Sequence, residues 1–447
     1  MIIKSPLPYQ VIQRGPRNTA PIPILVEAAA PIEARLLLGK NVIADWRKIP
    51  ASGGSIKNVP VGGPYTLEVR TGDKVKRVPG LLIGDLWILA GQSNMDGCGK
   101  LIDLEPPSKH VNCFYYGDTW GVAADPLCLL NYAVEPVHWA SPDPAVREGG
   151  RQWDRLYRDF GAGLGVRFGK EMHKATGIPV GLIMCSHGGT PMWQWDPKLK
   201  SKGGESLYGT LIRRVNLCGG KVAGCLWYQG ESDTDASVVA GYKKNTRRLI
   251  ESLRSDLGDP NLPFLYVQLG PFLIWDPNLN IAGWNSVRDQ QLQLESEMKN
   301  IALAAAIDCT VSDPIHLDAV SEKRIGMRLA KLARRIAFGE KIEVGPRPDK
   351  IAFVDGDRTR IRVTYRGVNR KLYPARGIWG FSVEMDGAPI PILKRAVEPD
   401  GKSVLLTLAN PAPKGANLWY GRGLFPTVDL KDGENFAAPC FGPYPLK

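Results

Sequence analysis

The feature that most constrains the fold is an alternation of apolar, strand-like runs with amphipathic, helix-like stretches between residues 85 and 338. Each apolar run has the length and composition of a buried strand. The runs are Leu86–Ala90, Val180–Cys185, Val222–Tyr228, Phe264–Leu269 and Ile301–Ile307. Strands that alternate with helices predict a parallel sheet covered by helices on both faces.

The stretches between these runs carry apolar side chains at helical spacing, and each stretch ends at a glycine, which favours a helix C-terminus. The three faces are Leu164, Phe168 and Met172 before Gly177; Tyr242, Leu249, Ile250, Leu253 and Leu257 before Gly258; and Ile325, Leu329, Leu332 and Ile336 before Gly339. The long segment from Asp96 to Gln152 interrupts this alternation of strand-like and helix-like stretches. It is rich in Pro, Trp and Tyr, and a loop of that length is often a binding loop.

Both ends of the chain favour β structure. Short apolar runs alternate there with Gly- and Pro-rich turn clusters, a pattern typical of sandwich-like regions. The pairs Asp355-Gly356, Asp386-Gly387 and Asp400-Gly401 predict hairpin turns. We therefore expect an N-terminal β region at 1–84, an α/β domain at 85–340 and a C-terminal β region at 341–447. The two β regions are candidates for one composite sandwich.

The composition is that of a globular protein, with 44% hydrophobic and 23% charged residues in 447. The net charge of +12 is spread along the chain, without a dense basic run interleaved with aromatic residues. This pattern predicts a solvated basic surface that favours acidic polymers, and it argues against a nucleic-acid partner.

The eight cysteines show no C-x-x-C pair and no zinc-finger spacing. Most lie in or near apolar runs. The sequence does not decide whether a disulfide forms among Cys98, Cys113 and Cys128. No apolar stretch is long enough to span a membrane. The first residues show no apolar stretch after Lys4, so we expect no signal peptide. Localisation and oligomeric state are not predicted.

The end of the first strand carries a candidate nucleophile. The apolar run drops into Gly91-Gln92-Ser93, where the glycine permits a tight turn. Open α/β sheets place their chemistry at the carboxyl ends of strands. On this stretch alone, Ser93 is equally consistent with a nucleophile and with a residue of a simple polar turn.

A serine nucleophile requires a base, a group that orients the base, and donors for the oxyanion. His316 follows the last strand and precedes the last helix, and Asp313 lies three residues earlier, where its carboxylate can fix the imidazole tautomer. His110, His138 and His173 favour surface or packing roles, because they lie in the long segment or on a helix.

Two further strand ends carry unusual polar turns. Gly188 and Gly189 can direct backbone N–H groups at a substrate oxygen, and the amide of Gln229 can supply another donor. The alternative for each is an ordinary strand-to-helix turn. The nearby Trp193, Trp195 and Trp227 fit either the core or a site for the flat faces of sugars.

Together these motifs resemble one protein family. The motifs are Gly91-Gln92-Ser93-Asn94-Met95, Gly188-Gly189-Thr190 with Trp195, Trp227-Tyr228-Gln229-Gly230-Glu231-Ser232 and Asp313-x-x-His316. In this order, over residues 85–338, they resemble the sialate O-acetylesterase and acetylxylan esterase-like branch of the SGNH hydrolases. The resemblance implies a three-layer α/β/α, flavodoxin-like domain flanked by β-sandwich-like regions. It also implies removal of acetyl groups from sugar hydroxyls without a metal or another cofactor.

By position in these motifs, the resemblance makes Ser93 the nucleophile, His316 the base and Asp313 its orienting group. The Ser93 N–H, an N–H of Gly188 or Gly189, and the Gln229 side chain would form the oxyanion hole. We expect the substrate to contact Asn94, Glu231 and Trp195.

Two positions depart from the family pattern. Leu317 stands where relatives often have Pro, and His187 stands where many have Trp. Neither residue supplies an atom to the proposed catalytic steps. His187 is a candidate for altering the acyl or sugar pocket, and a weaker candidate for a competing base, because no carboxylate partner is placed beside it by the pattern.

We therefore expect a serine carboxylesterase that acts on O-acetylated carbohydrate, either sialic acid or a polysaccharide, through an acetyl-enzyme. One alternative is a carbohydrate-binding or adhesion protein with an inactive hydrolase domain. Another is an esterase for esters that are not sugars, which a long apolar cap would favour, whereas Asp96–Gln152 is mixed and aromatic.

Overall fold

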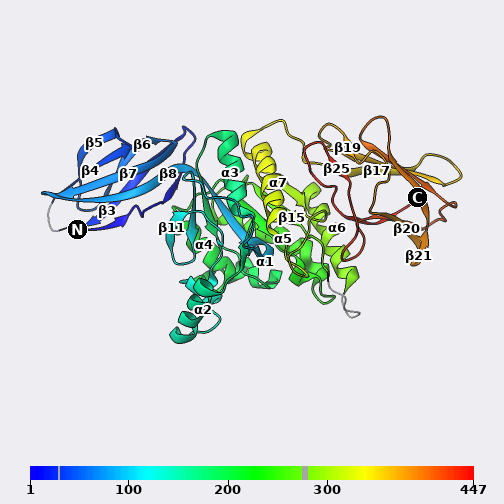
Figure 1. The fold of residues 1–447 in the computed structure, drawn as a ribbon, viewed down its shortest axis with the longest axis horizontal. Helices are drawn as coiled ribbons and strands as arrows, with labels where there is room; N and C mark the ends of the chain where they lie inside the picture. The colour runs from blue at the N-terminus through cyan, green and yellow to red at the C-terminus, as the bar shows by residue number, and fades with distance from the viewer. Residues whose placement is uncertain (29–30, 274–279) are drawn as a thin grey trace. The chain divides into compact units, whose positions relative to one another are not determined.

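The computed structural model describes residues 1–28, 31–273 and 280–447, and it shows a mixed α/β protein (Figure 1). The chain divides into two compact units. The first consists of Met1–Gly188, Gln194–Leu226 and Arg254–Leu262, and the second of Gly189–Trp193, Trp227–Leu253 and Pro263–Lys447. Strand β14, Gly224–Tyr228, contributes residues to both units.

The N-terminal region of the first unit is built from β-strands. Its elements are β1 Ile2–Ser5, β2 Val11–Gln13, β3 Thr19–Glu27, β4 Ile32–Leu38, β5 Asn41–Ile49, β6 Gly54–Pro60 and β7 Gly62–Thr71. Buried and exposed residues alternate along β3, as expected of a strand with one face on a core. That face packs with apolar residues of β4, β6 and β7 into one hydrophobic cluster, so the predicted β structure is confirmed.

Strand β8, Lys74–Gly91, connects this region with the α/β sheet (Figure 1). Its first half pairs antiparallel with β7, and its second half pairs in parallel with β13, Val180–Met184. Every residue from Leu81 to Gly91 is buried, because neighbouring strands and packed side chains surround this half. The strand order in the first unit is β11-β10-β13-β8-β14.

In the second unit the sheet order is β14-β15-β16, and β15 and β16 pair in parallel. The bounds are Phe264–Gln268 for β15 and Ile301–Ala305 for β16, and all their residues are buried. The helices of the chain are α1 Ser93–Asp96, α2 Pro144–Leu156, α3 Gly165–Thr176, α4 Leu207–Leu217, α5 Tyr242–Asp256, α6 Ile281–Glu297 and α7 Ala319–Phe338. Helices α6 and α7 pack against β15 and β16, and α3 packs against β13. The predicted strands and helical faces are therefore present.

The C-terminal region of the second unit is again built from β-strands around its own hydrophobic cluster. Its sheets run β17-β18-β23-β22, β19-β25 and β21-β20-β24-β26. The strands are β17 Arg347–Phe353, β18 Arg360–Arg366, β19 Leu372–Tyr373, β20 Phe381–Met385, β21 Ala388–Ile390, β22 Ile392–Val397, β23 Ser403–Leu408, β24 Asn417–Tyr420, β25 Lys431–Asp432 and β26 Phe441–Pro445. Asp386 and Gly387 have φ values of 50° and 82°, the backbone of the predicted two-residue hairpin between β20 and β21.

The segment from Asp96 to Gln152 is more regular than a long loop. It contains β9 Gly99–Lys100, β10 Val111–Tyr115, β11 Thr119–Val122 and the first turns of α2. Strand β10 pairs in parallel with β13 and extends the sheet by one position, which the sequence did not predict. All eight cysteines are free, so no disulfide joins Cys98, Cys113 and Cys128. Among the residues that the structure describes, no helix is long and apolar enough to cross a membrane.

Candidate functional site

Ser93 lies just beyond the carboxyl end of β8. Gly91 has a φ of 136°, a conformation that glycine adopts readily, and this turn redirects the chain after β8. Ser93 is the first residue of α1 and is half-buried. Because the first N–H groups of a helix have no partner within it, the Ser93 backbone N–H is a donor that a ligand oxygen can use.

Gly188 lies directly against Ser93. The N–H of the preceding residue, His187, donates to the Gly91 carbonyl at 2.9 Å, which holds the turn after β13 beside the turn after β8. A Cβ atom at Gly188 would lie 3.4 Å from Ser93 Cβ and 3.2 Å from Asp96 Oδ2. The second distance is tighter than most real Cβ contacts, so this close approach of backbone to Ser93 favours glycine.

A cleft of 340 Å³ opens beside the α1 turn and within the first unit. It is lined by Asp96, Gly97, Cys98, Cys128, Leu130, Asn131, His138, Trp139, Ala140, Arg158, Phe160 and His187. Arg158 stacks over the Phe160 ring at 4.5 Å and pairs with Asp154 at 2.8 Å, so its guanidinium is fixed in place. Aromatic walls with a few placed polar groups are typical of a site for a small polar molecule.

His138 and His187 form a pair at this cleft, with 2.9 Å between their Nδ1 atoms. One ring must donate and the other accept, so two neutral imidazoles satisfy the contact. Burial lowers the pKa of His138 well below its ordinary value, and the neighbouring His187 and Arg214 lower it further. Burial also lowers the pKa of His187. Within this pair, the group that contacts His187 Nδ1 is a second imidazole.

Asp313 and His316 meet in the second unit, in the turn between β16 and α7. Asp313 Oδ2 lies 2.6 Å from His316 Nδ1, while its Oδ1 accepts the backbone N–H groups of Ile315 and His316 at 2.9 and 2.8 Å. Burial raises the pKa of Asp313, but the hydrogen bonds from the His316 ring and from the backbone outweigh it and hold the pKa below its ordinary value. An ionised Asp313 keeps the proton on Nδ1 and leaves Nε2 as the basic nitrogen.

Gln229 is completely buried in the second unit, and its amide nitrogen is engaged twice. Nε2 donates to the Thr190 carbonyl at 3.1 Å and to Asp233 Oδ2 at 2.5 Å. A primary amide has two N–H bonds, so neither is left for an oxyanion in this arrangement. The prediction that Gln229 donates to the oxyanion is not supported by this geometry. Its contacts instead hold the turn at Gly189–Thr190, and Gly189 itself is exposed with a φ of 70°.

The predicted substrate contacts differ in accessibility. Asn94 and Glu231 are buried, with 2% and 8% of their surface exposed. Trp195 has no exposed surface at all, because it belongs to the core, so its burial does not support stacking on a sugar. Trp227 is also in the core, whereas Trp193 is 62% exposed and is the tryptophan of this group that a ligand can reach.

Sequence reasoning missed several residues of these sites. His138, Trp139 and Arg158 line the cleft beside α1, and the aromatic character of the long segment was the available signal. Asp233 directly follows the Gln229 motif in the sequence, and it fixes Gln229 and also accepts the Met192 N–H at 2.9 Å. Within the described part of the chain, no group of three or more His, Cys, Asp or Glu side chains is arranged to hold a metal ion.

A mixed α/β fold with a serine after its central strand, and an Asp–His pair after its last parallel strand, is typical of carboxylic ester hydrolases. Residues 83–335 match the family model described as carbohydrate esterase, sialic acid-specific acetylesterase, over more than half of the chain. The chain belongs to this family, which confirms the resemblance seen in its motifs.

Curated relatives agree with this assignment. A probable carbohydrate esterase of Arabidopsis thaliana is 28% identical over 263 residues, which cover 55% of this chain and 88% of the relative. The sialate O-acetylesterase of Homo sapiens is 26% identical over 330 residues, covering 65% of this chain and 61% of the human protein. Among solved structures, a carbohydrate acetylesterase from Xanthomonas citri matches with a TM-score of 0.67 and 21% identity, covering 98% and 99% of the two chains. That match shows a common fold.

Proposed function

We propose that this carbohydrate esterase hydrolyses O-acetyl esters with Ser93 as nucleophile, His316 as general base and Asp313 as the group that orients His316. The observation that carries the proposal is the 2.6 Å contact between Asp313 Oδ2 and His316 Nδ1. It fixes the tautomer in which Nε2 can accept a proton, and that tautomer is what a serine nucleophile requires of its base.

The reaction has two halves. In the first, Ser93 Oγ forms a bond to the acetyl carbonyl carbon while His316 Nε2 takes the hydroxyl proton. The carbon–oxygen bond to the sugar then breaks, and His316 returns the proton to the departing sugar oxygen. In the second half, His316 takes a proton from water, the resulting hydroxide attacks the acetyl-enzyme, and acetate leaves as Ser93 is reprotonated. No cofactor takes part in these steps.

The tetrahedral intermediate needs hydrogen-bond donors for its negative oxygen. We assign these donors to the backbone N–H groups of Ser93 and Gly188. The approach of Gly188 to Ser93 supports this choice, whereas Gly189 was an equal candidate on sequence alone. Gln229 then acts as a positioning residue, because its amide holds Asp233 and the Thr190 carbonyl.

The substrate is an O-acetylated sugar, either a sialic acid ester or an acetylated polysaccharide. The cleft beside α1 would hold the sugar, with Trp139 and Phe160 as apolar walls and Arg158 as a cationic group. The family description and the human sialate O-acetylesterase among the relatives support the sialic acid ester. Asn94 and Glu231 complete the proposed substrate contacts.

The finer architecture belongs to the same proposal. A three-layer α/β/α domain at 85–340 would carry the chemistry between β-sandwich-like regions at 1–84 and 341–447. The complete burial of β13, β14, β15 and β16 supports the three layers, because a strand buried on both faces must be covered on both.

The test compares the wild-type protein with the Ser93→Ala variant. We expect the variant to keep its melting temperature and to lose release of acetate from O-acetylated sialic acid, acetylated xylan and p-nitrophenyl acetate. It should also lose labelling by a fluorophosphonate, which reacts with an activated serine. Undiminished turnover in the variant would contradict the assignment of Ser93. The ratio of activities on the two carbohydrate substrates would select the substrate class.

A further inference from the structure

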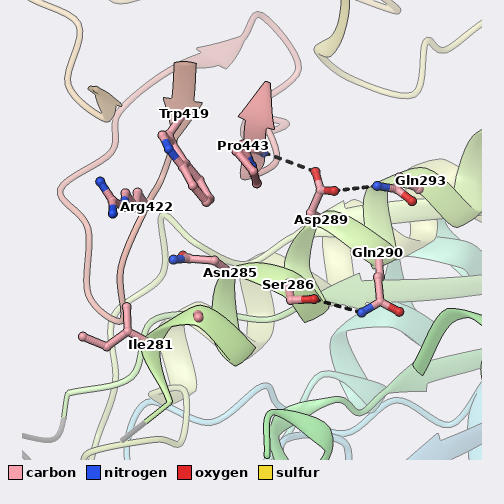
Figure 2. Close-up of a pocket in the computed structure, with 11 residues that line it drawn as sticks. Ile281, Asn285, Ser286, Asp289, Gln290, Gln293, Trp419, Arg422 and Pro443 are labelled. Atoms are coloured by element: carbon pink, nitrogen blue, oxygen red, sulfur yellow. Dashed lines mark hydrogen bonds between the residues drawn. The ribbon is translucent and has the colours of Figure 1, made fainter. Parts of the chain in front are cut away.

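A second cleft lies wholly within the second unit, between helix α6 and the C-terminal strands β24 and β26 (Figure 2). Its volume is 740 Å³, which falls in the range of small-molecule sites. It is lined by Ile281, Ala282, Asn285, Ser286, Asp289, Gln290, Gln293, Trp419, Arg422, Gly442 and Pro443. None of these residues takes part in the proposed catalytic steps.

Trp419 forms the aromatic wall of this cleft. Its Nε1 donates to Glu384 at 3.0 Å, and the Arg422 guanidinium lies 5.1 Å from the ring centroid. Gly442 packs against the ring so closely that a Cβ there would lie 2.7 Å from Trp419 Cε3. The indole is therefore held in one orientation while remaining only half-buried, and Figure 2 shows it pointing toward Asn285 and Ser286.

The opposite wall is the polar face of α6. Asp289 accepts the Gly442 N–H at 3.2 Å and the Gln293 Nε2 at 2.6 Å, and Gln290 Nε2 donates to Ser286 Oγ at 3.1 Å. These bonds orient the side chains. Gln290 Nε2 also donates to the Val239 carbonyl at 2.8 Å, so both of its N–H groups are used, while the Asp289 carboxylate, the Ser286 hydroxyl and the Gln293 amide retain further capacity to accept or donate. Such a wall suits a ligand that carries several hydroxyl groups.

The cleft is preformed by buried contacts on either side of it. Asn285 Oδ1 accepts the Gly423 N–H at 2.9 Å. Arg288 is completely buried and donates to the carbonyls of Gly423 and Leu424, as well as to those of Leu269 and Gly270. The loop that follows Trp419 is thus attached to α6 and to the end of β15. A rigid cleft loses little conformational entropy when a ligand binds.

The residues that line the cleft carry no excess of positive charge. Asp289 contributes one negative charge, and the positive charge of Arg422 is paired with Glu384. A phosphate or a polyanion would need an excess of positive charge, and a lipid would need walls that are mostly apolar. A neutral sugar instead offers a flat apolar face to an indole and hydroxyl groups to amides and carboxylates.

From this combination we infer that the cleft at Trp419 is a carbohydrate-binding subsite that takes a neutral, hydroxyl-rich sugar unit. The indole packs on the flat face of the ring, and Ser286, Asp289 and Gln293 bond to its hydroxyl groups. The subsite retains a carbohydrate chain on the protein whether or not that chain carries an ester, so this inference does not depend on the proposed catalytic residues.

The test uses carbohydrates without acetyl groups, so that binding is measured apart from hydrolysis. Affinity electrophoresis through gels containing deacetylated xylan, glucomannan, galactan or mixed-linkage β-glucan gives a dissociation constant for each polymer. The variants are Trp419→Ala, which removes the aromatic wall, and Ala282→Trp, which fills the cleft and removes no hydrogen bond of the native side chain. Trp379→Ala is the matched control, because Trp379 is 59% exposed in the same unit and does not line the cleft.

We expect the wild-type protein to be retarded by at least one neutral polymer. The dissociation constant should rise roughly tenfold in Trp419→Ala and in Ala282→Trp and stay unchanged in Trp379→Ala. Turnover of p-nitrophenyl acetate should be equal in all four proteins. Absence of retardation by any of these polymers, or equal retardation of the wild-type and Ala282→Trp proteins, would overturn the inference. Loss of ester turnover in Ser93→Ala with unchanged retardation would separate the two sites.

Discussion

The Asp313–His316 pair is the most informative contact at the scale of single residues, because one carboxylate both orients a ring and closes a turn. Oδ2 accepts a hydrogen bond from the ring Nδ1–H, and Oδ1 accepts the backbone N–H groups of Ile315 and His316. Ring orientation and turn geometry therefore depend on the same side chain. The short sequence separation of the pair also explains why it could be predicted from the sequence.

Replacing Asp313 with asparagine should reverse the tautomer of His316. The Asn Nδ2 would donate to Nδ1, and the ring proton would then lie on Nε2, where it blocks acceptance of the Ser93 proton. We expect kcat/KM for p-nitrophenyl acetate to fall roughly 10²- to 10⁴-fold. The melting temperature should change little, since Oδ1 can still accept the two backbone N–H groups. A value of kcat/KM within twofold of wild type would contradict the proposed role of Asp313.

The His138–His187 pair should make stability depend on pH. Burial holds the pKa of both rings below the ordinary value of 6.5 in the folded protein, and His138 is affected most. The unfolded chain therefore binds more protons than the folded chain once the pH drops below 6.5. The contribution of the two neutral rings to the free energy of unfolding is fully present above that pH. It is lost as the pH falls through the pKa of the folded state, by at most about 1.4 kcal/mol per pH unit for each ring.

The variant His138→Gln removes one of these titrating groups and keeps a hydrogen-bond partner for His187. We expect the free energy of unfolding to decline less between pH 7.5 and pH 5.5 in the variant than in the wild type. Urea unfolding at the two pH values measures the difference. An equal decline in both proteins would show that His138 does not contribute to the pH dependence.

At the scale of elements, α6 ties parts of the second unit together. Its Arg288 donates to carbonyls at the end of β15 and in the loop after β24, while Gln291 Nε2 reaches the Gln229 carbonyl at 3.1 Å. Burial lowers the pKa of Arg288, yet four of its five N–H donors are used by carbonyl oxygens. One helix thus supports both the polar turn at Gln229 and the cleft at Trp419.

The variant Arg288→Met should keep the length of the side chain and leave those carbonyls without their donors. Unsatisfied buried acceptors are costly, so we expect a loss of about 2–5 kcal/mol in the free energy of unfolding. Urea unfolding measures the loss. The matched control is Arg366→Met, because Arg366 is exposed at the end of β18. Equal stability of the two variants would contradict the role given to Arg288.

The elements that the sequence predicted are those with a local signal. Apolar runs gave the central strands, and glycines at positive φ, such as Gly177 and Gly339, mark the ends of α3 and α7. Strand β10 was missed because no helical pattern follows it directly; β11 pairs back onto it within a stretch rich in turns. Its place in the sheet comes from its pairing with β13, which lies far along the chain.

The same distinction applies to the candidate site. Asp313 and His316 are close in sequence, whereas the Gln229 amide is occupied by Thr190, 39 residues away. The motif identified Gln229 but could not show that its donors are used. Likewise, the burial of Trp195 follows from packing that no local pattern records.

At the scale of the whole molecule, each β region has its own hydrophobic cluster, drawn from residues 20–83 in one and 361–446 in the other. Both regions therefore bury apolar surface by themselves, as independent cores do. The packing of the two regions into one composite sandwich stays a prediction. So do the domain boundaries at 84 and 340.

The net charge of +12 is a property of the whole chain, and it should affect the rate at which charged substrates arrive. A positive field attracts anions over a distance that shrinks as salt is added, from about 30 Å at 0.01 M to about 8 Å at 0.15 M. We expect kcat/KM for O-acetylated sialic acid, an anion, to fall several-fold between these salt concentrations, while the value for the neutral p-nitrophenyl acetate stays constant. Neutral acetylated xylo-oligosaccharides provide the matched carbohydrate control. Equal salt dependence for the anionic and neutral sugars would mean that the positive charge lies where it does not guide the substrate.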